Sequence, residues 1–250
     1  TAGLAFDSKD RYFYGTTRIG GDANNNGTLF KFGGYYHGYS YAVALRFGLG
    51  HPWDPANPYA TPFISADNGD IYTTEAAGGG YLLGDLTAID ISGQGRDVHS
   101  FAGTVNDDGA NREGTLVEYN GYFYGTTTYG GSDGLGTIFK VRWNGGEYSL
   151  LYSFKGVCCG RSDGSFPVGG LVLKNGQLYG TTINGGSASD LGTVFKFDPN
   201  TGDETVLHAF AGTDGAHPYA RVAFHGKKLY GTTNGGGPHN QGVLFKMPLK

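Results

Sequence analysis

Residues Tyr179–Phe197 read YGTTINGGSASDLGTVFKF, and this stretch decides the fold because it recurs along the chain. Related copies begin at Tyr14, Tyr72, Tyr124 and Tyr230, so the tyrosines stand roughly 50 residues apart. In all five copies two glycines occupy the sixth and seventh positions after the tyrosine. A repeated unit of this size cannot bury its apolar face alone, so the copies are expected to stack against one another.

The fourth copy shows four short strands separated by turns. Residues 171–174 form an apolar run, Asn175-Gly176 is a two-residue hairpin turn, and residues 177–182 return. Residues 193–198 alternate in polarity as a half-buried strand does, and residues 204–210 form the fourth strand. These strands are called A, B, C and D in each repeat. Four antiparallel strands per repeat are typical of a propeller blade.

We therefore predict an all-β fold, a five-bladed β-propeller with four-stranded antiparallel blades. A β-solenoid is the alternative architecture, although its coils are usually shorter. The last repeat ends after strand C, so either its blade has three strands or the two ends of the chain pair. One domain is predicted over residues 1–250, with repeats at about 3–47, 62–101, 114–154, 170–210 and 220–250.

Composition argues against several classes of protein. The net charge is −4, charged residues make up 16% of the chain and no basic run occurs, so nucleic acid is not an expected partner. No apolar stretch approaches the roughly 18 residues of a membrane span. The polar, tyrosine-rich composition and the unusual first residue, Thr1, favour a mature secreted chain, which we expect to be a monomer.

The two cysteines, Cys158 and Cys159, are adjacent. They are either two reduced thiols in a loop or a vicinal disulfide, and the disulfide requires an oxidising compartment. The seven histidines show no metal-site spacing, and no cofactor is expected. Calcium on the axis of the propeller stays open, with Asp22, Asn24 and Asn25 as candidate ligands.

The repeat resembles a bacterial tandem-repeat family. The segments SDGSFPVGGLVLKNGQLYGTTINGG (162–186) and TDGAHPYARVAFHGKKLYGTTNGGG (213–237) carry the resemblance, which covers nearly the whole chain. The family is sometimes called the choice-of-anchor tandem repeats, predicted propeller modules of secreted or surface-anchored proteins. The resemblance implies an architecture, but no defined activity and no set of catalytic residues.

Loop lengths indicate which face carries a site. The A–B and C–D connections are mostly short, whereas the B–C and D–A connections are long and open on the same rim of a blade. Long loops on a rigid scaffold are where binding sites are built, so we expect one asymmetric site on this face. The D–A loops are expected at 48–61, 102–113, 155–169 and 211–219, and the B–C loops at 18–26, 76–84, 128–135, 183–191 and 234–241.

Residues that recur in every repeat are expected to be structural. An aspartate recurs in the D–A loops and is interpreted as capping a turn. The threonine pair after each Tyr-Gly is expected to bond neighbouring blades or turns, and the five tyrosines to pack between blades. The aspartates are Asp54, Asp108, Asp163 and Asp214.

Residues that break the repeat are the candidates for function. Glu75 stands where the other copies have threonine, so it is either the general acid or base of an enzyme or a solvated glutamate in a decayed repeat. Trp53 suits stacking on a sugar face or packs over the base of its loop, and Arg18 suits a carboxylate or a ring. The full predicted set of binding residues is Arg18, His51, Trp53, Arg112, Tyr129, Arg161, Phe166, His217, Tyr219 and His239.

Three functions fit these residues. The first is a secreted carbohydrate-binding protein, that is, a lectin with one asymmetric site, whose partner is an extracellular glycan or polysaccharide. The second is a polysaccharide-degrading enzyme, either a glycoside hydrolase with two carboxylates about 5–10 Å apart or a uronate lyase with a Tyr or His base. The third is a structural or protein-interaction module. Whether the protein is an enzyme stays open.

Overall fold

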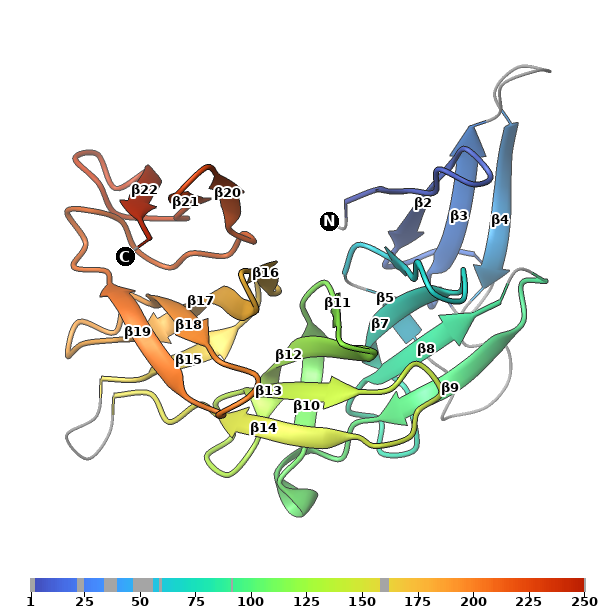
Figure 1. The fold of residues 1–250 in the computed structure, drawn as a ribbon, viewed down its shortest axis with the longest axis horizontal. Helices are drawn as coiled ribbons and strands as arrows, with labels where there is room; N and C mark the ends of the chain where they lie inside the picture. The colour runs from blue at the N-terminus through green and yellow to red at the C-terminus, as the bar shows by residue number, and fades with distance from the viewer. Residues whose placement is uncertain are drawn as a thin grey trace.

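The residues that the structure describes form five antiparallel β-sheets that follow one another along the sequence (Figure 1). The computed structural model describes residues 3–21, 25–33, 40–46, 56–58, 60–90, 92–157 and 162–249. Within these ranges the one helical element is a single 3₁₀ turn, η1 (Gly103–Asn106). None of the described segments is a helix with the length and apolar character needed to cross a lipid bilayer.

The first and last sheets differ from the three between them. The first has four strands in the order β1-β2-β3-β4, and the last has three in the order β20-β21-β22, with no fourth strand among the described residues. Their bounds are β1 (Ala5–Phe6), β2 (Tyr12–Thr17), β3 (Thr28–Gly33), β4 (Ser40–Arg46), β20 (Ala223–His225), β21 (Lys228–Thr232) and β22 (Leu244–Pro248).

Each of the three middle sheets divides its first strand into two segments. In the second sheet both β5 and β6 pair with β7, and the third and fourth sheets repeat this arrangement. The second sheet contains β5 (Ala56–Pro58), β6 (Phe63–Ile64), β7 (Ile71–Ala77), β8 (Asp85–Ile89) and β9 (Gly95–Ser100). The third contains β10 (Gly109–Glu113), β11 (Val117–Tyr119), β12 (Tyr122–Gly130), β13 (Thr137–Val141) and β14 (Ser149–Ser153). The fourth contains β15 (Gly164–Pro167), β16 (Val172–Lys174), β17 (Gln177–Gly185), β18 (Thr193–Phe197) and β19 (Glu204–Ala209).

The extra segments correct the prediction that the D–A connections are loops throughout. β10 and β15 lie inside the predicted 102–113 and 155–169 loops, yet they pair with the far ends of β12 and β17. β12 and β17 extend beyond the A–B hairpin. The backbone N–H and C=O groups along this extension pair with β10 and β15, which belong to the segments that arrive from the preceding sheets. Backbone pairing of this kind needs no apolar alternation, so short Gly- and Pro-containing segments can provide it.

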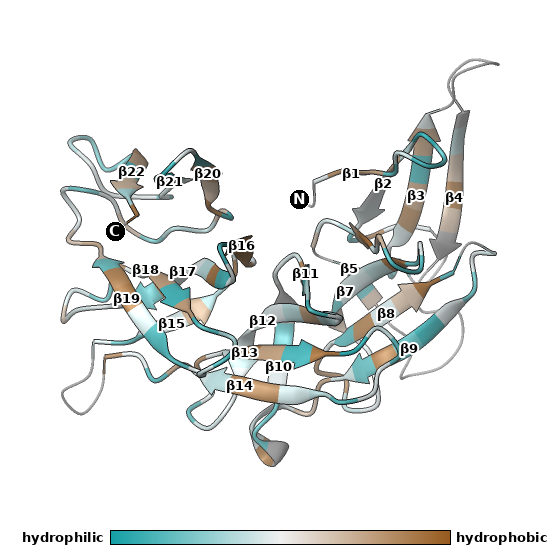
Figure 2. Cartoon of the chain, in the orientation of Figure 1, coloured by the Kyte–Doolittle hydropathy of each residue, from teal (hydrophilic) through white to brown (hydrophobic). Residues whose placement is uncertain are grey.

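The core lies between neighbouring sheets, and brown apolar positions alternate with teal ones along the strands (Figure 2). The repeat tyrosines Tyr14, Tyr72, Tyr124 and Tyr179 are buried in these interfaces, which confirms that they pack between blades. The threonine pair also behaves as predicted. In the first and fourth sheets its first member donates to a carbonyl in the segment that leads into the following sheet: Thr16 Oγ1 to Ala60 O at 3.3 Å and Thr181 Oγ1 to Ala220 O at 3.4 Å.

One apolar position is buried in four sheets and exposed in the fifth. Leu29, Leu86, Ile138 and Val194 pair in register with the first threonine of the repeat or its equivalent, and none of them is exposed. Leu244 occupies the same register position in the last sheet, and 75% of its surface is exposed. The described residues therefore leave this face of the last sheet uncovered.

Candidate functional site

Aspartates of the repeat close the turn that leads from each sheet to the next. Asp163 accepts hydrogen bonds from the N–H groups of Lys155 and Gly164 and from the hydroxyl of Tyr152. Asp108 accepts from the N–H groups of Ala102 and Gly109, and His99 and Tyr148 also bond to it. The predicted capping role is confirmed at these positions and at Asp214, which accepts from Ala211 N at 2.9 Å, whereas Asp54 lies outside the described residues.

Three residues after each of these aspartates, the backbone turns to a left-handed conformation. The residues are Asn57 (φ 58°), Asn111 (φ 49°), Phe166 (φ 59°) and His217 (φ 53°). Each N–H donates to a carbonyl in the B–C loop of the preceding sheet: to Asn26 O at 2.8 Å, Leu83 O at 2.6 Å, Leu135 O at 2.8 Å and Leu191 O at 2.8 Å. The same backbone contact therefore joins four successive pairs of sheets.

This position displays a side chain at the rim. Its neighbours in the chain are buried, as Ser165 and Pro167 are beside Phe166, while the side chain itself is half-buried. A left-handed conformation is costly for a bulky residue, and such residues concentrate at functional sites. Two of the predicted binding residues, Phe166 and His217, occupy this position. The sequence signal for this position is the fourth residue of the motif Asp-Gly-x-x-Pro, which is complete at 163–167 and 214–218.

Tyr129 and Phe166, both predicted site residues, lie together at the rim. Tyr129 is near the end of β12 in the third sheet, and Phe166 belongs to β15 in the fourth. Their ring centroids are 5.5 Å apart with an interplanar angle of 62°. Tyr129 is 44% exposed and Phe166 is half-buried. The two sheets thus present an edge-to-face aromatic pair to solvent.

His217 lies at the next junction along the rim. Its Nδ1 is 2.9 Å from the carbonyl of Ile183, and it borders a cavity of about 530 Å³ together with Asn234 and Asn240. Tyr219, Arg18 and His239 are exposed, and no described contact joins them to Tyr129 or Phe166. The predicted set is therefore spread along the rim rather than gathered at one point.

Several predicted positions lie outside the described residues. These are His51, Trp53, Arg161, Cys158, Cys159, Asp22 and Asn24, together with the side chain of Arg112. Asn25, the remaining candidate calcium ligand, uses its Oδ1 to accept the N–H of Gly20 at 2.6 Å. Among the described residues, no group of three acidic, cysteine or histidine side chains is arranged to hold a metal ion.

Glu75 does not face solvent, which corrects the interpretation of it as a solvated residue or an open-face acid. None of its surface is exposed. Thr73 Oγ1 donates to its Oε1 at 2.5 Å, and Thr87 Oγ1 donates to its Oε2 at 3.2 Å. Burial raises the pKa of Glu75 to about 8, although both threonine hydrogen bonds act to lower it. The carboxyl group of Glu75 is therefore enclosed within the second sheet, out of contact with solvent.

Asp85 stands opposite Glu75 and is also fully buried. Its Oδ1 is 3.5 Å from Ser100 Oγ, a hydroxyl that also bonds to Asp97 at 3.0 Å, while its Oδ2 has no hydrogen-bond partner. Burial raises the pKa of Asp85 to about 10, and the nearby carboxyl groups of Asp97 and Glu75 act in the same direction. The second sheet therefore places two buried carboxyl groups opposite each other, at a register position where the first, third and fourth sheets pair two threonines.

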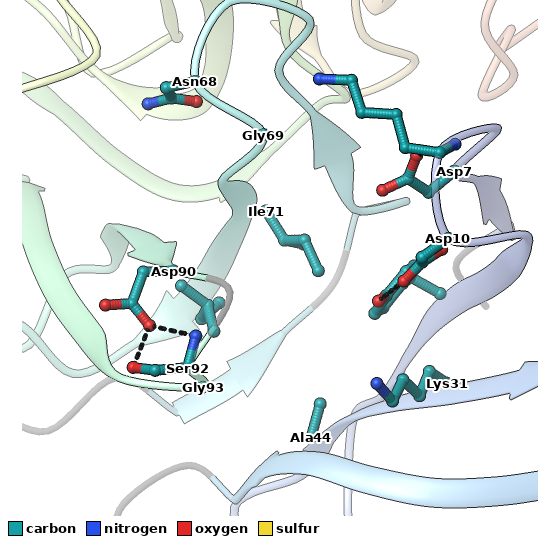
Figure 3. Close-up of a pocket in the computed structure, with 13 residues that line it drawn as sticks. Asp7, Asp10, Lys31, Ala44, Asn68, Gly69, Ile71, Asp90, Ser92 and Gly93 are labelled. Atoms are coloured by element: carbon teal, nitrogen blue, oxygen red, sulfur yellow. Dashed lines mark hydrogen bonds between the residues drawn. The ribbon is translucent and has the colours of Figure 1, made fainter.

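A second cavity lies on the opposite rim, where the short turns meet. It has a volume of about 570 Å³ and lies between the first and second sheets (Figure 3). Its polar lining includes Asp10, Tyr14 and Lys31 from the first sheet and Asp90 and Ser92 from the second. Loop length gave no signal for this cavity, because short turns border it.

Solved structures with similar architecture include TolB from Acinetobacter baumannii, with 16% sequence identity and a TM-score of 0.57 over 98% of this chain and 51% of that chain. A GH74 xyloglucanase from Xanthomonas campestris is similar at 11% identity and a TM-score of 0.59, over 96% of this chain and 35% of that one. An oligogalacturonate lyase in complex with manganese is similar at 15% identity and a TM-score of 0.54, over 90% and 55%.

Identities at this level show the fold alone, and the chain spans about half the length, or less, of each of these structures. The all-β, propeller-like fold predicted from the repeats is confirmed. No curated protein matches this sequence. The predicted likeness to a bacterial tandem-repeat family is confirmed at the level of the family. The model of the Gloeobacter/Verrucomicrobia repeat matches residues 2–245, and the chain belongs to that family.

Proposed function

We propose that the protein is a carbohydrate-binding propeller that holds an extracellular polysaccharide at its long-loop rim, where the third and fourth sheets meet. The observation that carries the proposal is the Tyr129–Phe166 pair, two aromatic rings from different sheets that lie 5.5 Å apart at the surface. Sugar rings have an apolar face that stacks on aromatic side chains, and rings fixed by the backbone lose little entropy when they bind.

The surroundings of the pair suit a neutral polymer. Ser132 and Asp133 follow Tyr129 in an exposed loop and offer a hydroxyl and a carboxylate to sugar hydroxyl groups. Polysaccharide-acting enzymes are among the proteins with this architecture, which fits the proposal without deciding it. The enzyme alternative is less favoured, because Glu75, its candidate acid or base, is enclosed within the second sheet.

The test is binding to a panel of neutral and uronic-acid polysaccharides by affinity electrophoresis and calorimetry, with Tyr129→Ala and Phe166→Asn as variants. Asparagine is chosen because it occupies the same left-handed position at Asn111. Tyr81→Ala is the control, since Tyr81 is an exposed tyrosine in the B–C loop of the second sheet.

We expect at least a tenfold loss of affinity in both rim variants and none in the control. Equal affinity in all four proteins would reject the rim site. New reducing ends with the ultraviolet absorbance of an unsaturated uronate would indicate a lyase, and new reducing ends without it would indicate a hydrolase. Either result would replace the binding proposal.

A further inference from the structure

The cavity between the first and second sheets exists because one side chain is small. In each four-stranded arrangement, strand D carries one unpaired bulge residue that points toward the next sheet. In the first sheet this residue is Ala44, and the other three sheets carry Val98, Leu151 and Leu207. Each larger side chain packs into the interface with the following sheet. Ala44 leaves that volume open and lines the cavity.

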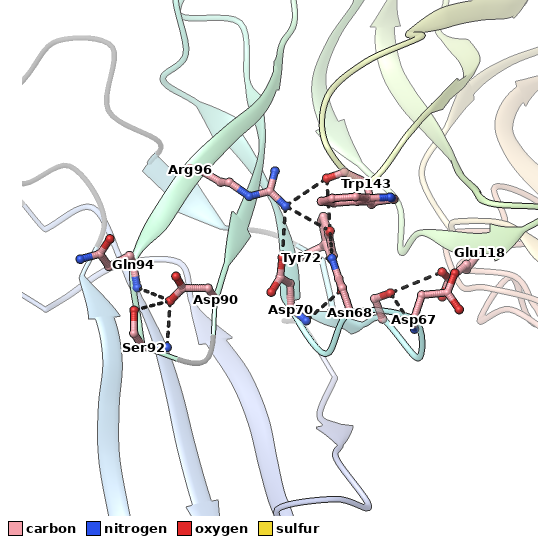
Figure 4. A network of polar contacts seen from close by, with 11 residues as sticks. Asp67, Asn68, Asp70, Tyr72, Asp90, Ser92, Gln94, Arg96, Glu118 and Trp143 are labelled. Atoms are coloured by element: carbon pink, nitrogen blue, oxygen red, sulfur yellow. Dashed lines mark hydrogen bonds and ion pairs between the residues drawn. The ribbon is translucent and has the colours of Figure 1, made fainter.

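The next interface shows how the same space is otherwise closed (Figure 4). Arg96 Nη2 bonds to Asp70 Oδ2 and to the carbonyl of Trp143, both at 3.1 Å, and the hydroxyl of Tyr72 bonds to the same carbonyl at 3.2 Å. In the first sheet, Ala42 occupies the register position that Arg96 has in the second sheet. No guanidinium group from this position therefore crosses the interface between the first and second sheets. Two small residues thus distinguish the open interface from the closed one.

The floor and walls of the cavity differ in chemistry. Ile71 and Ile89 are buried and form an apolar floor with Ala44. Figure 3 shows Asp10 and Lys31 on the wall from the first sheet, and Asp90 with Ser92 on the facing wall.

The polar groups are of mixed charge and are held in place. Asp90 Oδ1 accepts the N–H and the hydroxyl of Ser92 at 2.8 and 2.6 Å and the N–H of Gln94 at 3.0 Å. All three of these bonds fall on Oδ1, and together they fix the carboxylate of Asp90 in the turn. Tyr14 donates its hydroxyl to Asp10 Oδ2 at 2.5 Å, which leaves the tyrosine oxygen as an acceptor.

We propose that this cavity is a second ligand site, which binds a small neutral saccharide, a monosaccharide or disaccharide. Three carboxylates and two ammonium groups line it: Asp7, Asp10, Asp90, Lys9 and Lys31. A phosphate or another strong anion would meet the carboxylates, and a strong cation would meet the ammonium groups. Sugar hydroxyl groups donate to carboxylates and accept from ammonium groups, and the apolar face of the sugar ring matches the isoleucine floor.

The site differs from the rim site in position and in the size of its ligand. It lies beside the short turns, whereas Tyr129 and Phe166 lie at the opposite ends of the strands, beside the long loops. A volume of about 570 Å³ is sufficient for one or two sugar rings. The two sites are tested by different ligands, so the failure of one proposal leaves the other standing.

The experiment is saturation-transfer NMR with glucose, galactose, xylose, arabinose, cellobiose and maltose, with glucose 6-phosphate and glucosamine as charged comparators. Ala44→Leu installs the side chain that Leu151 and Leu207 already place at this position, so it fills the cavity without altering a polar group. Ala223→Leu is the matched control, since Ala223 is exposed on β20 in the last sheet.

We expect at least one neutral sugar to bind the native protein and the Ala223→Leu variant, and to bind Ala44→Leu at least tenfold more weakly. Asp90→Ala, a change at an exposed residue, should weaken the same sugar at least threefold and keeps the test valid if Ala44→Leu misfolds. Undiminished binding in both cavity variants, no binding of any neutral sugar, or a preference for a charged comparator would each overturn the proposal.

Discussion

Glu75 and Asp85 face each other across β7 and β8 at a register position where three other sheets pair two threonines. In those sheets the hydroxyl groups hydrogen-bond across the strands, at 2.9 Å for Thr17 and Thr28. The corresponding distances are 2.8 Å for Thr127–Thr137 and 2.7 Å for Thr182–Thr193. The second sheet thus replaces a neutral pair with two buried carboxyl groups, which must keep their protons or bury charge.

The acidic pair should make the protein less stable as the pH rises. Burial raises the pKa of Glu75 to about 8 and that of Asp85 to about 10, so the folded protein holds protons that the unfolded chain releases above about pH 4. Their stabilising contribution is full below that pH and is lost as the pH rises through the folded pKa values. Thermal unfolding followed by circular dichroism should give a lower Tm near pH 9 than near pH 5.

Restoring the threonine pair should remove most of this loss. We expect Glu75→Thr with Asp85→Thr to raise Tm near pH 9 by at least about 5 °C, which corresponds to roughly 2 kcal/mol. Glu204, whose pKa burial also raises to about 8, leaves part of the dependence in place. Asp133→Thr, at an exposed aspartate, is the control. A double variant that is no more stable than the native protein at high pH would show that the two buried carboxyl groups do not destabilise the folded protein.

The capping aspartate should be worth several hydrogen bonds. Asp163→Ala leaves the N–H groups of Lys155 and Gly164 and the hydroxyl of Tyr152 without their acceptor. We expect the free energy of unfolding to fall by about 2–4 kcal/mol in urea titrations. Asp203→Ala, at an exposed turn, should cost less than about 1 kcal/mol, and equal losses in the two variants would contradict the capping role.

Substitutions at Gly180 and Phe195, which pair in register, should have coupled effects on the free energy of unfolding. A Cβ on Gly180 would lie 2.5 Å from Cζ of Phe195, so Gly180→Thr should destabilise by about 1–3 kcal/mol. The second sheet has Thr73 and Thr87 at these two register positions, and both fit. Gly180→Thr with Phe195→Thr should therefore cost at least about 1 kcal/mol less than the sum of the single variants. Additive losses in urea unfolding would reject the coupling.

The uncovered face of the last sheet should tolerate a charge. Leu244→Asp is expected to change the free energy of unfolding by less than about 0.5 kcal/mol, because 75% of the side chain is already exposed. Val194→Asp places the same charge where no surface is exposed, and it should cost more than about 4 kcal/mol or prevent folding. The two variants are compared by thermal unfolding, and a large loss for Leu244→Asp would mean that its face is covered in solution.

The strands and their order could be predicted from the sequence because the same strand and turn pattern recurs in several repeats. Alternation in 193–198 and the Asn175-Gly176 turn predict a hairpin and a third strand, and the structure has both. Capping by Asp163 was predictable because an aspartate before glycine favours a turn. The segments β10 and β15 were missed because backbone pairing without an apolar pattern leaves no periodic signal.

The environment of Glu75 could have been recognised from covariation between repeats. Where the first, third and fourth copies have Gly, Thr, Thr and Phe, the second has Thr73, Glu75, Asp85 and Thr87, and this joint change indicates that the four residues touch. The cavity beside Ala44 could not be predicted in this way. The volume is open because Ala44 is small, and Ala44 occupies this place because a bulge leaves it unpaired; a sequence does not reveal which strand residue is left unpaired.

The left-handed position at the rim has a consequence for how this repeat can change. Asn57, Asn111, Phe166 and His217 are anchored through their N–H groups, so the contact between sheets is the same whichever side chain is present. Neighbouring sheets are thereby joined by the main chain, and four different side chain positions at the rim are left to vary. A library randomised at these four positions would vary the specificity of the surface while the scaffold beneath it stays constant.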